Sequence, residues 1–142
     1  MPSDRLLHAM NAAHRVLLRL TRGRVGWTYH GMPMLELTTT GRVSGRRRAT
    51  MLSSPVQLGE TLVIVASRGG DDTQPAWYLN LVAEPRVEVV RRGRAAVPMV
   101  ARVATPDERA ELWPQITKDH PNYAAYQTRT DREIPVVFLD PA

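Results

Sequence analysis

Residues 34–48 read MLELTTTGRVSGRRR, an apolar and β-branched segment followed by a turn rich in glycine and arginine. Segment 34–39 predicts a strand, Gly41 and Gly45 predict a turn, and the next strand is expected to begin at Arg48. Glycine lets a backbone come close to a ligand, and neighbouring hydroxyl and guanidinium groups can bind anionic oxygens. The turn therefore suits a phosphate or a carboxylate. A solvated, basic hairpin tip has the same composition and stays open as an alternative.

Five more strands are expected after the strand at residues 34–39, because short apolar or alternating segments are separated by turn residues. They cover residues 48–56, 61–67, 86–91, 94–104 and 134–139. The first two should pair across Gly59 and Glu60, and Pro98 favours a sheet edge or a bulge for its strand. Hairpin-length connections indicate a mainly antiparallel sheet, which could bury its faces by curling into a small barrel flanked by helices.

Three short helices are expected between the strands. A proline-initiated helix covers residues 75–83, and the capping box at residues 105–108 (TPDE) starts another. Pro114 should kink or restart that second helix, and a third should follow Pro121.

An amphipathic helix is also expected at the N-terminus, over residues 4–21, with Ser3 as its N-cap. It has an apolar face and a separate face rich in arginine. Two placements are open: packing on the rest of the domain, or lying as a peripheral contact on the inner face of a membrane.

The composition favours a cytoplasmic protein with a single domain. The chain has 142 residues, enough for one core, and no cysteine, which excludes disulfides and thiolate chemistry. The first residues do not resemble a signal peptide, and no apolar run is long enough to span a bilayer. The net charge of +5 comes from arginine, since Lys118 is the only lysine. Arginine favours phosphate and carboxylate partners.

A second anion-binding segment is expected at residues 66–70 (ASRGG), between a strand and the helix at 75–83. Successive amides in a glycine turn form an anion nest, and a helix N-terminus adds its positive dipole. An ordinary loop has the same composition. Two adjacent anion-binding segments, this loop and the arginine turn, would however suit an elongated ligand with several negative charges. Trp77 and Tyr78 on the next helix could line the same groove or anchor the helix to the core.

No local catalytic constellation is present in the sequence. The four histidines lack metal-ligand spacing, and no carboxylate pair completes a site, so no metal is expected. The chain has no nucleophile elbow, P-loop or dinucleotide fingerprint. Demanding chemistry would therefore need a cofactor.

Four segments, in order and at suitable spacing, resemble the deazaflavin-dependent nitroreductase family: residues 37–42 (LTTTGR), 64–70 (IVASRGG), 75–81 (PAWYLNL) and 126–136 (YQTRTDREIPV). The resemblance implies an α+β split β-barrel that binds coenzyme F420, a deazaflavin whose side chain carries a phosphate and a glutamate tail. It also implies one domain over residues 1–142, with the amphipathic helix in 1–22 and the coenzyme-binding barrel in 34–141. This ligand has the elongated shape and the negative charge that suit the two predicted anion-binding segments.

The resemblance further implies which residues hold the coenzyme. Arg42, Ser44 and Arg48 would contact the phosphate and the glutamate tail, with Arg46 and Arg47 nearby. The complete implied set is Arg42, Val43, Ser44, Arg48, Ala49, Thr50, Met51, Ser53, Ala66, Ser67, Arg68, Gly69, Ala76, Trp77, Tyr78, Leu79, Asn80 and Tyr123.

The substrate side is implied to contain Tyr123, Tyr126 and His120. Tyr126 or Tyr123 would orient the acceptor or supply a proton. Three residues depart from the family pattern. Val43 stands where a lysine is common, Arg68 replaces a lysine, and His120 stands where a nitroreductase has another tyrosine. Activity on bicyclic nitroimidazoles is therefore not implied.

The implied function is hydride transfer from reduced coenzyme F420 to a small electrophile, such as a quinone, an activated alkene or a nitro compound. Two alternatives explain part of the sequence. A nucleic-acid-binding module would use the arginine turn and the aromatic residues at 77 and 78, although no nucleic acid is expected from the four segments together. A coenzyme carrier would keep the fold without the catalysis.

Overall fold

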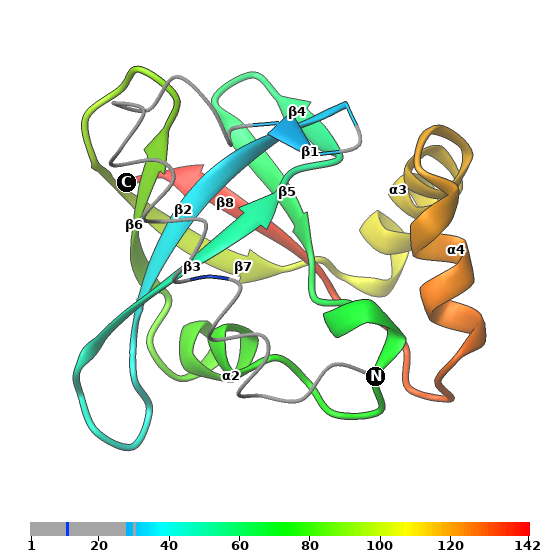
Figure 1. Ribbon diagram of the computed structural model, residues 1–142, viewed down its shortest axis with the longest axis horizontal. Helices are drawn as coiled ribbons and strands as arrows, with labels where there is room; N and C mark the ends of the chain where they lie inside the picture. Colours follow the sequence, from blue (N-terminus) through cyan, green and yellow to red (C-terminus); the bar gives the residue numbers. More distant parts are fainter. Residues whose placement is uncertain (1–10, 12–27, 30) are drawn as a thin grey trace.

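The computed structural model of the chain describes residue 11, residues 28–29 and residues 31–142 (Figure 1). Its strands are β1 (Thr28–Tyr29), β2 (Met32–Thr40), β3 (Arg47–Ser53), β4 (Val56–Leu58), β5 (Thr61–Val65), β6 (Arg86–Arg91), β7 (Val97–Val103) and β8 (Val136–Pro141). Its helices are the short 3-10 helix η1 (Arg68–Gly70) and the α-helices α2 (Ala76–Ala83), α3 (Pro106–Asp119) and α4 (Pro121–Thr128). The amphipathic helix expected over residues 4–21 lies outside the described residues, apart from Asn11.

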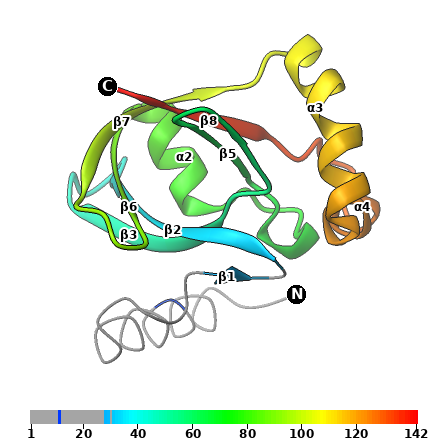
Figure 2. The ribbon, with the colours of Figure 1, turned by 90° about the horizontal axis from the view of Figure 1, so that it is seen from above.

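The strands form one antiparallel sheet in the order β1-β2-β6-β7-β8-β5-β4, and β3 pairs with β2 off this path. The sheet curls so that its two ends approach each other, with α2 at the open end and α3 and α4 on one flank (Figures 1 and 2). This is the α+β split barrel expected from the sequence. The hairpin expected at residues 34–48 is β2–β3, in which Thr40 pairs with Arg47.

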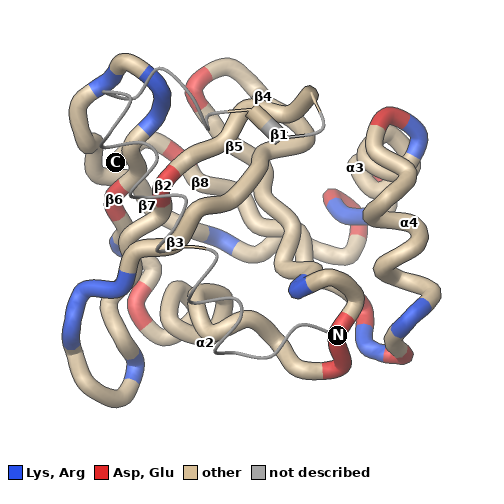
Figure 3. Tube along the Cα trace, in the orientation of Figure 1, with Lys and Arg blue, Asp and Glu red and all other residues tan. Residues whose placement is uncertain are grey.

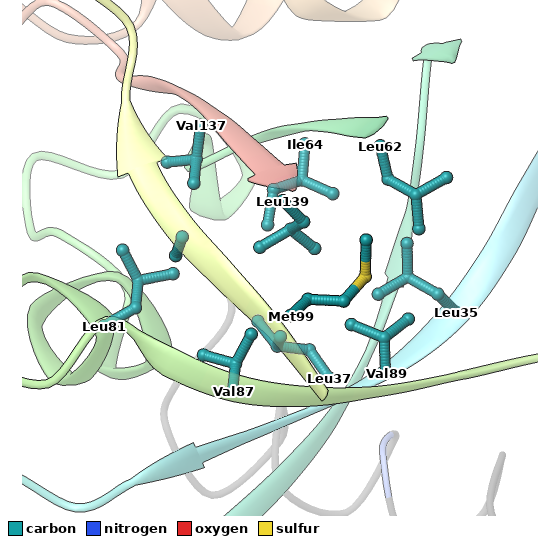
Figure 4. Close-up of a cluster of buried hydrophobic side chains, with 11 residues drawn as sticks. Leu35, Leu37, Leu62, Ile64, Leu81, Val87, Val89, Met99, Val137 and Leu139 are labelled. Carbon is teal, nitrogen blue, oxygen red and sulfur yellow. The ribbon is translucent and has the colours of Figure 1, made fainter. Parts of the chain in front are cut away.

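The interior of the barrel is filled by aliphatic side chains from β2, β5, β6, β7, β8 and α2 (Figure 4). Leu37, Ile64 and Leu139 are fully buried in it. Side chains alternate along a strand, so every second residue over part of each of these five strands reaches this core. Because the core occupies the inside of the barrel, ligands must bind at its rim or on its outside.

A second core lies between the outer face of the sheet and helices α3 and α4. The intervening residues of β5 and β8, such as Val63 and Phe138, point into it together with Ile116 of α3. The strands β5 and β8 are thus buried on both faces, which explains their continuous apolar sequences. This second core fixes α4, the helix that carries the tyrosines.

The start of α3 follows the expected capping box. Thr105 Oγ1 accepts a hydrogen bond from the amide of Glu108 at 3.2 Å, and the Glu108 carboxylate accepts one from the amide of Thr105 at 3.0 Å. Pro114 does not restart the helix, because α3 continues through it to Asp119. The helices expected at 75–83 and after Pro121 are α2 and α4.

The strand expected over residues 48–56 is wrong as a single element. β3 ends at Ser53, and the buried hydroxyl of Ser54 donates to the carbonyls of Val56 at 2.9 Å and Val63 at 2.7 Å. Only the short β4 pairs with β5 across the turn at Gly59, whereas β3 pairs with β2. This division and the two-residue β1 raise the described strands from the expected six to eight.

The expectation of an edge strand or a bulge at Pro98 is also wrong, since β7 lies between β6 and β8. The register with β8 begins only at Met99, however, and the carbonyl of Pro98 accepts a bond from Ala142 beyond it. The amide nitrogen and the carbonyl of one strand residue point to the same side. The nitrogen of Pro98 therefore faces away from β6, so its missing N–H removes no hydrogen bond from the pairing of β6 with β7.

Candidate active site

The turn between β2 and β3 is closed by its own backbone. The amide of Gly41 donates to the carbonyl of Arg46, and the amide of Gly45 donates to the carbonyl of Gly41, both at 2.8 Å. Gly45 has a φ of +72°, a conformation that glycine adopts without strain. Residues 42–48 are all exposed, and they form a basic tip at one corner of the molecule (Figure 3).

The amide side chain of Asn80 joins this turn to α2. Its Oδ1 accepts hydrogen bonds from the backbone amide of Arg42 at 3.1 Å and from Arg42 Nη1 at 3.3 Å. Its Nδ2 donates to Thr39 Oγ1 at 3.3 Å. Asn80 and Thr39 are both buried. The first and third segments of the sequence pattern are therefore in direct contact, and the predicted ligand role of Asn80 is combined with a structural one.

The remaining arginines of the turn differ in their contacts. Arg47 donates to Thr40 Oγ1 at 2.9 Å and pairs with the carboxylate of Glu88 at 3.5 Å. Within the described residues, the side chains of Arg46 and Arg48 form no ion pair, and both are exposed. Ser44 Oγ accepts the amide of Arg46 at 3.2 Å. Arg46 and Arg48 are thus the turn arginines whose charges are available to a ligand.

The predicted residues of β3 lead from this turn to α4. Ala49 and Thr50 are half-buried, and Met51 is buried, with its amide donating to Asn11 Oδ1 at 3.1 Å. At the far end of the strand, Ser53 Oγ and the hydroxyl of Tyr123 lie 3.2 Å apart in a hydrogen bond.

The loop after β5 has the backbone shape of an anion nest. Ser67 is right-handed helical, with φ −79° and ψ −38°, and Arg68 and Gly69 follow with positive φ of 45° and 64°. An αR residue followed by αL residues directs successive amides toward one point. Arg68 Nη1 pairs with Asp71 Oδ2 at 3.1 Å. The pKa of Asp71 is lowered, first by the hydrogen bond from the amide of Thr73 and then by the charge of Arg68.

The absence of a side chain at Gly70 lets this loop pack directly against α4. A Cβ on Gly70 would lie 2.5 Å from the carbonyl oxygen of Tyr126 and 2.9 Å from its Cα. Glycine is therefore required at this position, which also has a φ of +83°. Arg129 Nη1 donates to the carbonyl of Gly69 at 3.2 Å on the same side. The nest and the tyrosine helix are consequently neighbours (Figure 1).

The two tyrosines of α4 have different surroundings. Tyr123 is buried, and its hydroxyl contacts both Ser53 and the sulfur of Met32, at 3.6 Å from Sδ. Tyr126 is half-buried; its ring meets that of Tyr123 edge-on, with 6.0 Å between centroids. His120 lies 6.4 Å from the Tyr123 ring at the junction of α3 and α4. The three predicted substrate-side residues thus lie together.

On α2, the aromatic residues have mainly a packing role. The rings of Trp77 and Tyr78 meet edge-on at 6.4 Å and pack against the barrel core. Leu79 is half-buried and Ala76 is exposed at the start of the helix. Anchoring of the helix, the alternative reading of the sequence, therefore accounts for much of this segment.

A family model described as F420H(2)-dependent quinone reductase matches residues 11–141. The chain belongs to this family. Membership makes it an oxidoreductase whose cofactor is coenzyme F420, and it confirms the family expected from the four segments.

Relatives and solved structures agree with this family. The chain is 39% identical over 130 residues to a Mycobacterium tuberculosis protein named F420H(2)-dependent quinone reductase, covering 89% of this chain and 86% of the relative. A solved F420-H2 dependent reductase, FDR-A, is 38% identical and covers 76% of this chain and 94% of its own, with a TM-score of 0.66. A structure described as a domain-swapped dimer is 35% identical, with coverages of 91% and 99% and a TM-score of 0.67.

The residues present fit the coenzyme of the family. An elongated anion needs several cationic donors along its tail and amide donors at its phosphate. The exposed guanidinium groups of Arg46 and Arg48 and the nest at residues 67–69 have this chemistry. Among the described residues, no cluster of histidine and carboxylate groups could hold a metal ion.

Sequence reasoning missed two polar residues of the fourth segment that support this family site. The guanidinium group of Arg132 contacts the nest loop from behind, with a bond from Nη2 to the carbonyl of Ser67 at 2.8 Å. Gln127 accepts the amide of Ile134 at 3.0 Å and donates to the carbonyl of Arg132 at 2.8 Å. The sequence held one indication of this role: Arg132 lies in the fourth segment of the family pattern, but the resemblance assigned that arginine no contact with the ligand.

A cavity of about 440 Å³ lies away from these residues, beside the β6–β7 turn. Arg91, Arg92 and Arg94 line it, and both Arg91 and Arg94 contact Glu60 Oε2, at 3.2 and 3.5 Å. The two arginines hold the pKa of Glu60 below its usual value, with Arg91 as the larger cause. Glu60 thus serves as a shared counter-ion for Arg91 and Arg94, whereas Arg46 and Arg48 of the β2–β3 turn form no ion pair among the described residues. No helix within the described residues is long and apolar enough to cross a membrane.

Proposed function

We propose that this chain transfers a hydride from reduced coenzyme F420 to a quinone. The observation that carries the proposal is the close contact between the nest loop and α4, which the missing side chain of Gly70 allows. A coenzyme phosphate bound by residues 67–69 would lie between the arginine turn, tied to α2 by Asn80, and the tyrosine pair. Family membership supports the reductase activity.

The turn and the loop would act as the binding elements. Arg42, Arg46 and Arg48 would bind the phosphate and the glutamate tail through charge-assisted hydrogen bonds. Asn80 holds the Arg42 turn in place before the ligand arrives, which lowers the ordering cost of binding. When bound, the coenzyme supplies the hydride, and the protein supplies position and polarity.

Tyr126 is the residue that we assign to the acceptor. Reduction of a quinone places negative charge on an oxygen, and a phenol can donate a hydrogen bond to that oxygen as the charge develops. The hydroxyl of Tyr123 is already engaged with Ser53 and Met32. Tyr123 would therefore orient the Tyr126 ring through the edge-on contact, while His120 borders the same cluster.

The test is the pair of variants Tyr126→Phe and Tyr123→Phe. For Tyr126→Phe we expect turnover with a quinone to fall by up to about 10²–10³, with unchanged affinity for the coenzyme. For Tyr123→Phe we expect a loss of about 1 kcal/mol in the free energy of unfolding, the typical value of one hydrogen bond. Single-turnover oxidation of the reduced coenzyme and urea unfolding measure the two effects. Unchanged turnover in both variants would assign the proton to solvent and the tyrosines to packing.

The same assay distinguishes the reductase from a coenzyme carrier. A carrier would bind reduced F420 without oxidising it when a quinone is added. Nitro compounds and activated alkenes in parallel reactions would show whether the quinone is the preferred acceptor.

A further inference from the structure

Arg132 is bonded to the nest loop along most of its length. Its guanidinium group donates to the carbonyls of Asp71 at 2.8 Å, Ala66 at 3.2 Å and Ser67 at 2.8 Å, and to Gln74 Oε1 at 2.8 Å. The partners lie 58 to 66 residues away in the sequence. One side chain therefore fixes the backbone between β5 and α2.

These contacts determine where the loop amides point. In a trans peptide group, the carbonyl of one residue and the amide of the next point in opposite directions. Because Arg132 holds the carbonyls of Ala66 and Ser67, the amides of Ser67 and Arg68 point away from it. The nest amides thus face the side opposite the guanidinium group.

The backbone that Arg132 holds is strained. Arg68 has a φ of 45° and is the only residue other than glycine with positive φ in the described part of the chain. Such a conformation disfavours L-residues and persists only where the surroundings impose it. Gln127 in turn fixes the segment of Arg132 by accepting the amide of Ile134 and donating to the carbonyl of Arg132.

We propose that Arg132 is a positioning residue that holds the amides of the nest toward the coenzyme phosphate without contacting the coenzyme. This inference rests on the proposed function, because it takes the phosphate as the ligand of the nest. It also gives the fourth segment of the sequence pattern a role. The segment shapes the phosphate site from behind.

The test compares Arg132→Lys with Arg102→Lys. Lysine keeps the charge but cannot reproduce a planar fork of five donors. Arg102 is a matched control, because its guanidinium group also makes several hydrogen bonds, to Asp140 at 2.9 Å and to Glu108 at 2.9 Å, away from the loop. Fluorescence titration would measure the dissociation constants of F420 and of the deazaflavin that lacks the phosphate and the tail. Amide hydrogen exchange without coenzyme would report on peptides covering residues 66–74.

For Arg132→Lys we expect F420 affinity to fall by about tenfold or more, as when donors to an anion are displaced. Affinity for the phosphate-free deazaflavin should change by less than about twofold, since that ligand does not use the nest amides. Exchange in residues 66–74 should accelerate, and Arg102→Lys should change none of these. If Arg132→Lys does not fold, Gln74→Ala, which removes a single contact, should show the same pattern at smaller size.

Two results would overturn the inference: unchanged F420 affinity in Arg132→Lys, or equal weakening of both ligands. Failure of the wild-type protein to bind F420 would instead count against the proposed function. In that case the exchange measurement alone would still decide whether Arg132 holds the loop.

Discussion

The arginines of the β2–β3 turn carry the same charge but have different contacts. Arg42 is bonded to Asn80, and Arg47 to Thr40 and Glu88, so part of their hydrogen-bonding capacity serves the fold. Arg46 and Arg48 have exposed side chains without ion pairs among the described residues. A ligand tail gains most from donors that do not have to leave another partner.

Arg48→Ala should therefore weaken F420 binding by tenfold or more, since a charge-assisted hydrogen bond contributes roughly 1.5–3 kcal/mol. The thermal unfolding temperature should stay unchanged, because Arg48 has no ion pair to lose within the described residues. Lys118→Ala, which removes the same charge from exposed α3, is the control. Equal titration midpoints for Arg48→Ala and wild type would remove this arginine from the site.

At the scale of elements, the contact between η1 and α4 holds the nest loop beside the tyrosines. It depends on the missing side chain of Gly70 and on the bonds from Arg129 and Arg132. Small changes there should move one element against the other.

Gly70→Ala should destabilise the protein through two effects. Positive φ costs an L-residue about 1–2 kcal/mol, and the clash with the Tyr126 carbonyl adds about 1–3 kcal/mol. Gly69→Ala is a matched control, because Gly69 has φ +64° but nothing within 4 Å of an added Cβ. Urea unfolding of both variants separates strain from clash. The prediction is wrong if the two variants lose equal stability.

The capping box of α3 makes stability depend on pH. The pKa of Glu108 is lowered, first by the hydrogen bond from the Thr105 amide and then by Arg102. A carboxylate with a lower pKa in the folded state stabilises the protein above its unfolded pKa, and this stabilisation is lost as pH falls through the folded value. Glu108→Gln should therefore lower the unfolding temperature at about pH 7, and its difference from wild type should shrink as pH falls below about 4.3, the ordinary pKa of a glutamate.

Thermal melts across this pH range measure the effect, with Glu111→Gln, an exposed glutamate of the same helix, as the control. A difference between Glu108→Gln and wild type that persists unchanged in acid would show that the shape of the side chain matters and its charge does not.

Elements were predictable from the sequence where residues close together in the chain specify both the type of element and where it begins. β6 has the bounds expected from its alternating pattern, and the capping box located the start of α3. The break between β3 and β4 was not predictable, because it depends on Ser54 bonding to Val63, nine residues away, inside an apolar run. In the candidate site, the arginine turn and the glycine loop could be predicted because their composition within a few residues is distinctive. The role of Arg132 could not, because it bonds to backbone carbonyls distant in the sequence, and every residue type carries such a carbonyl.

At the scale of the whole molecule, two clusters of arginine lie at opposite ends of β2: the β6–β7 turn and the β2–β3 turn. Leu35 pairs with Arg91 near one end, and Thr40 pairs with Arg47 at the other. Glu60 neutralises part of the first cluster. Arg46 and Arg48 of the second cluster have no ion pair among the described residues, so their charges are available to an anionic tail (Figure 3).

Affinity for F420 should consequently fall as salt rises and should increase with the length of the glutamate tail. Ions screen exposed charges over a distance of about 10 Å at 0.1 M salt, and each added glutamate offers a partner to Arg46 or Arg48. Titrations of F420 species with different tail lengths at several ionic strengths measure this. A dissociation constant that ignores both salt and tail length would identify the arginine run as a solvated surface.

The burial of β5 and β8 on both faces also has a consequence for folding fidelity. Strands with one polar face resist a shift of one residue, since the shift would bury polar side chains. Leu62, Val63, Ile64 and Val65 offer no such penalty, so the pairing must be set at the strand ends. There Thr61 donates to Asp140 at 2.8 Å, and the amide of Ala66 donates to the carbonyl of Pro135 at 2.9 Å. The hydrogen bond between Thr61 and Asp140 therefore favours the observed register of β5 and β8 over a pairing shifted by one residue.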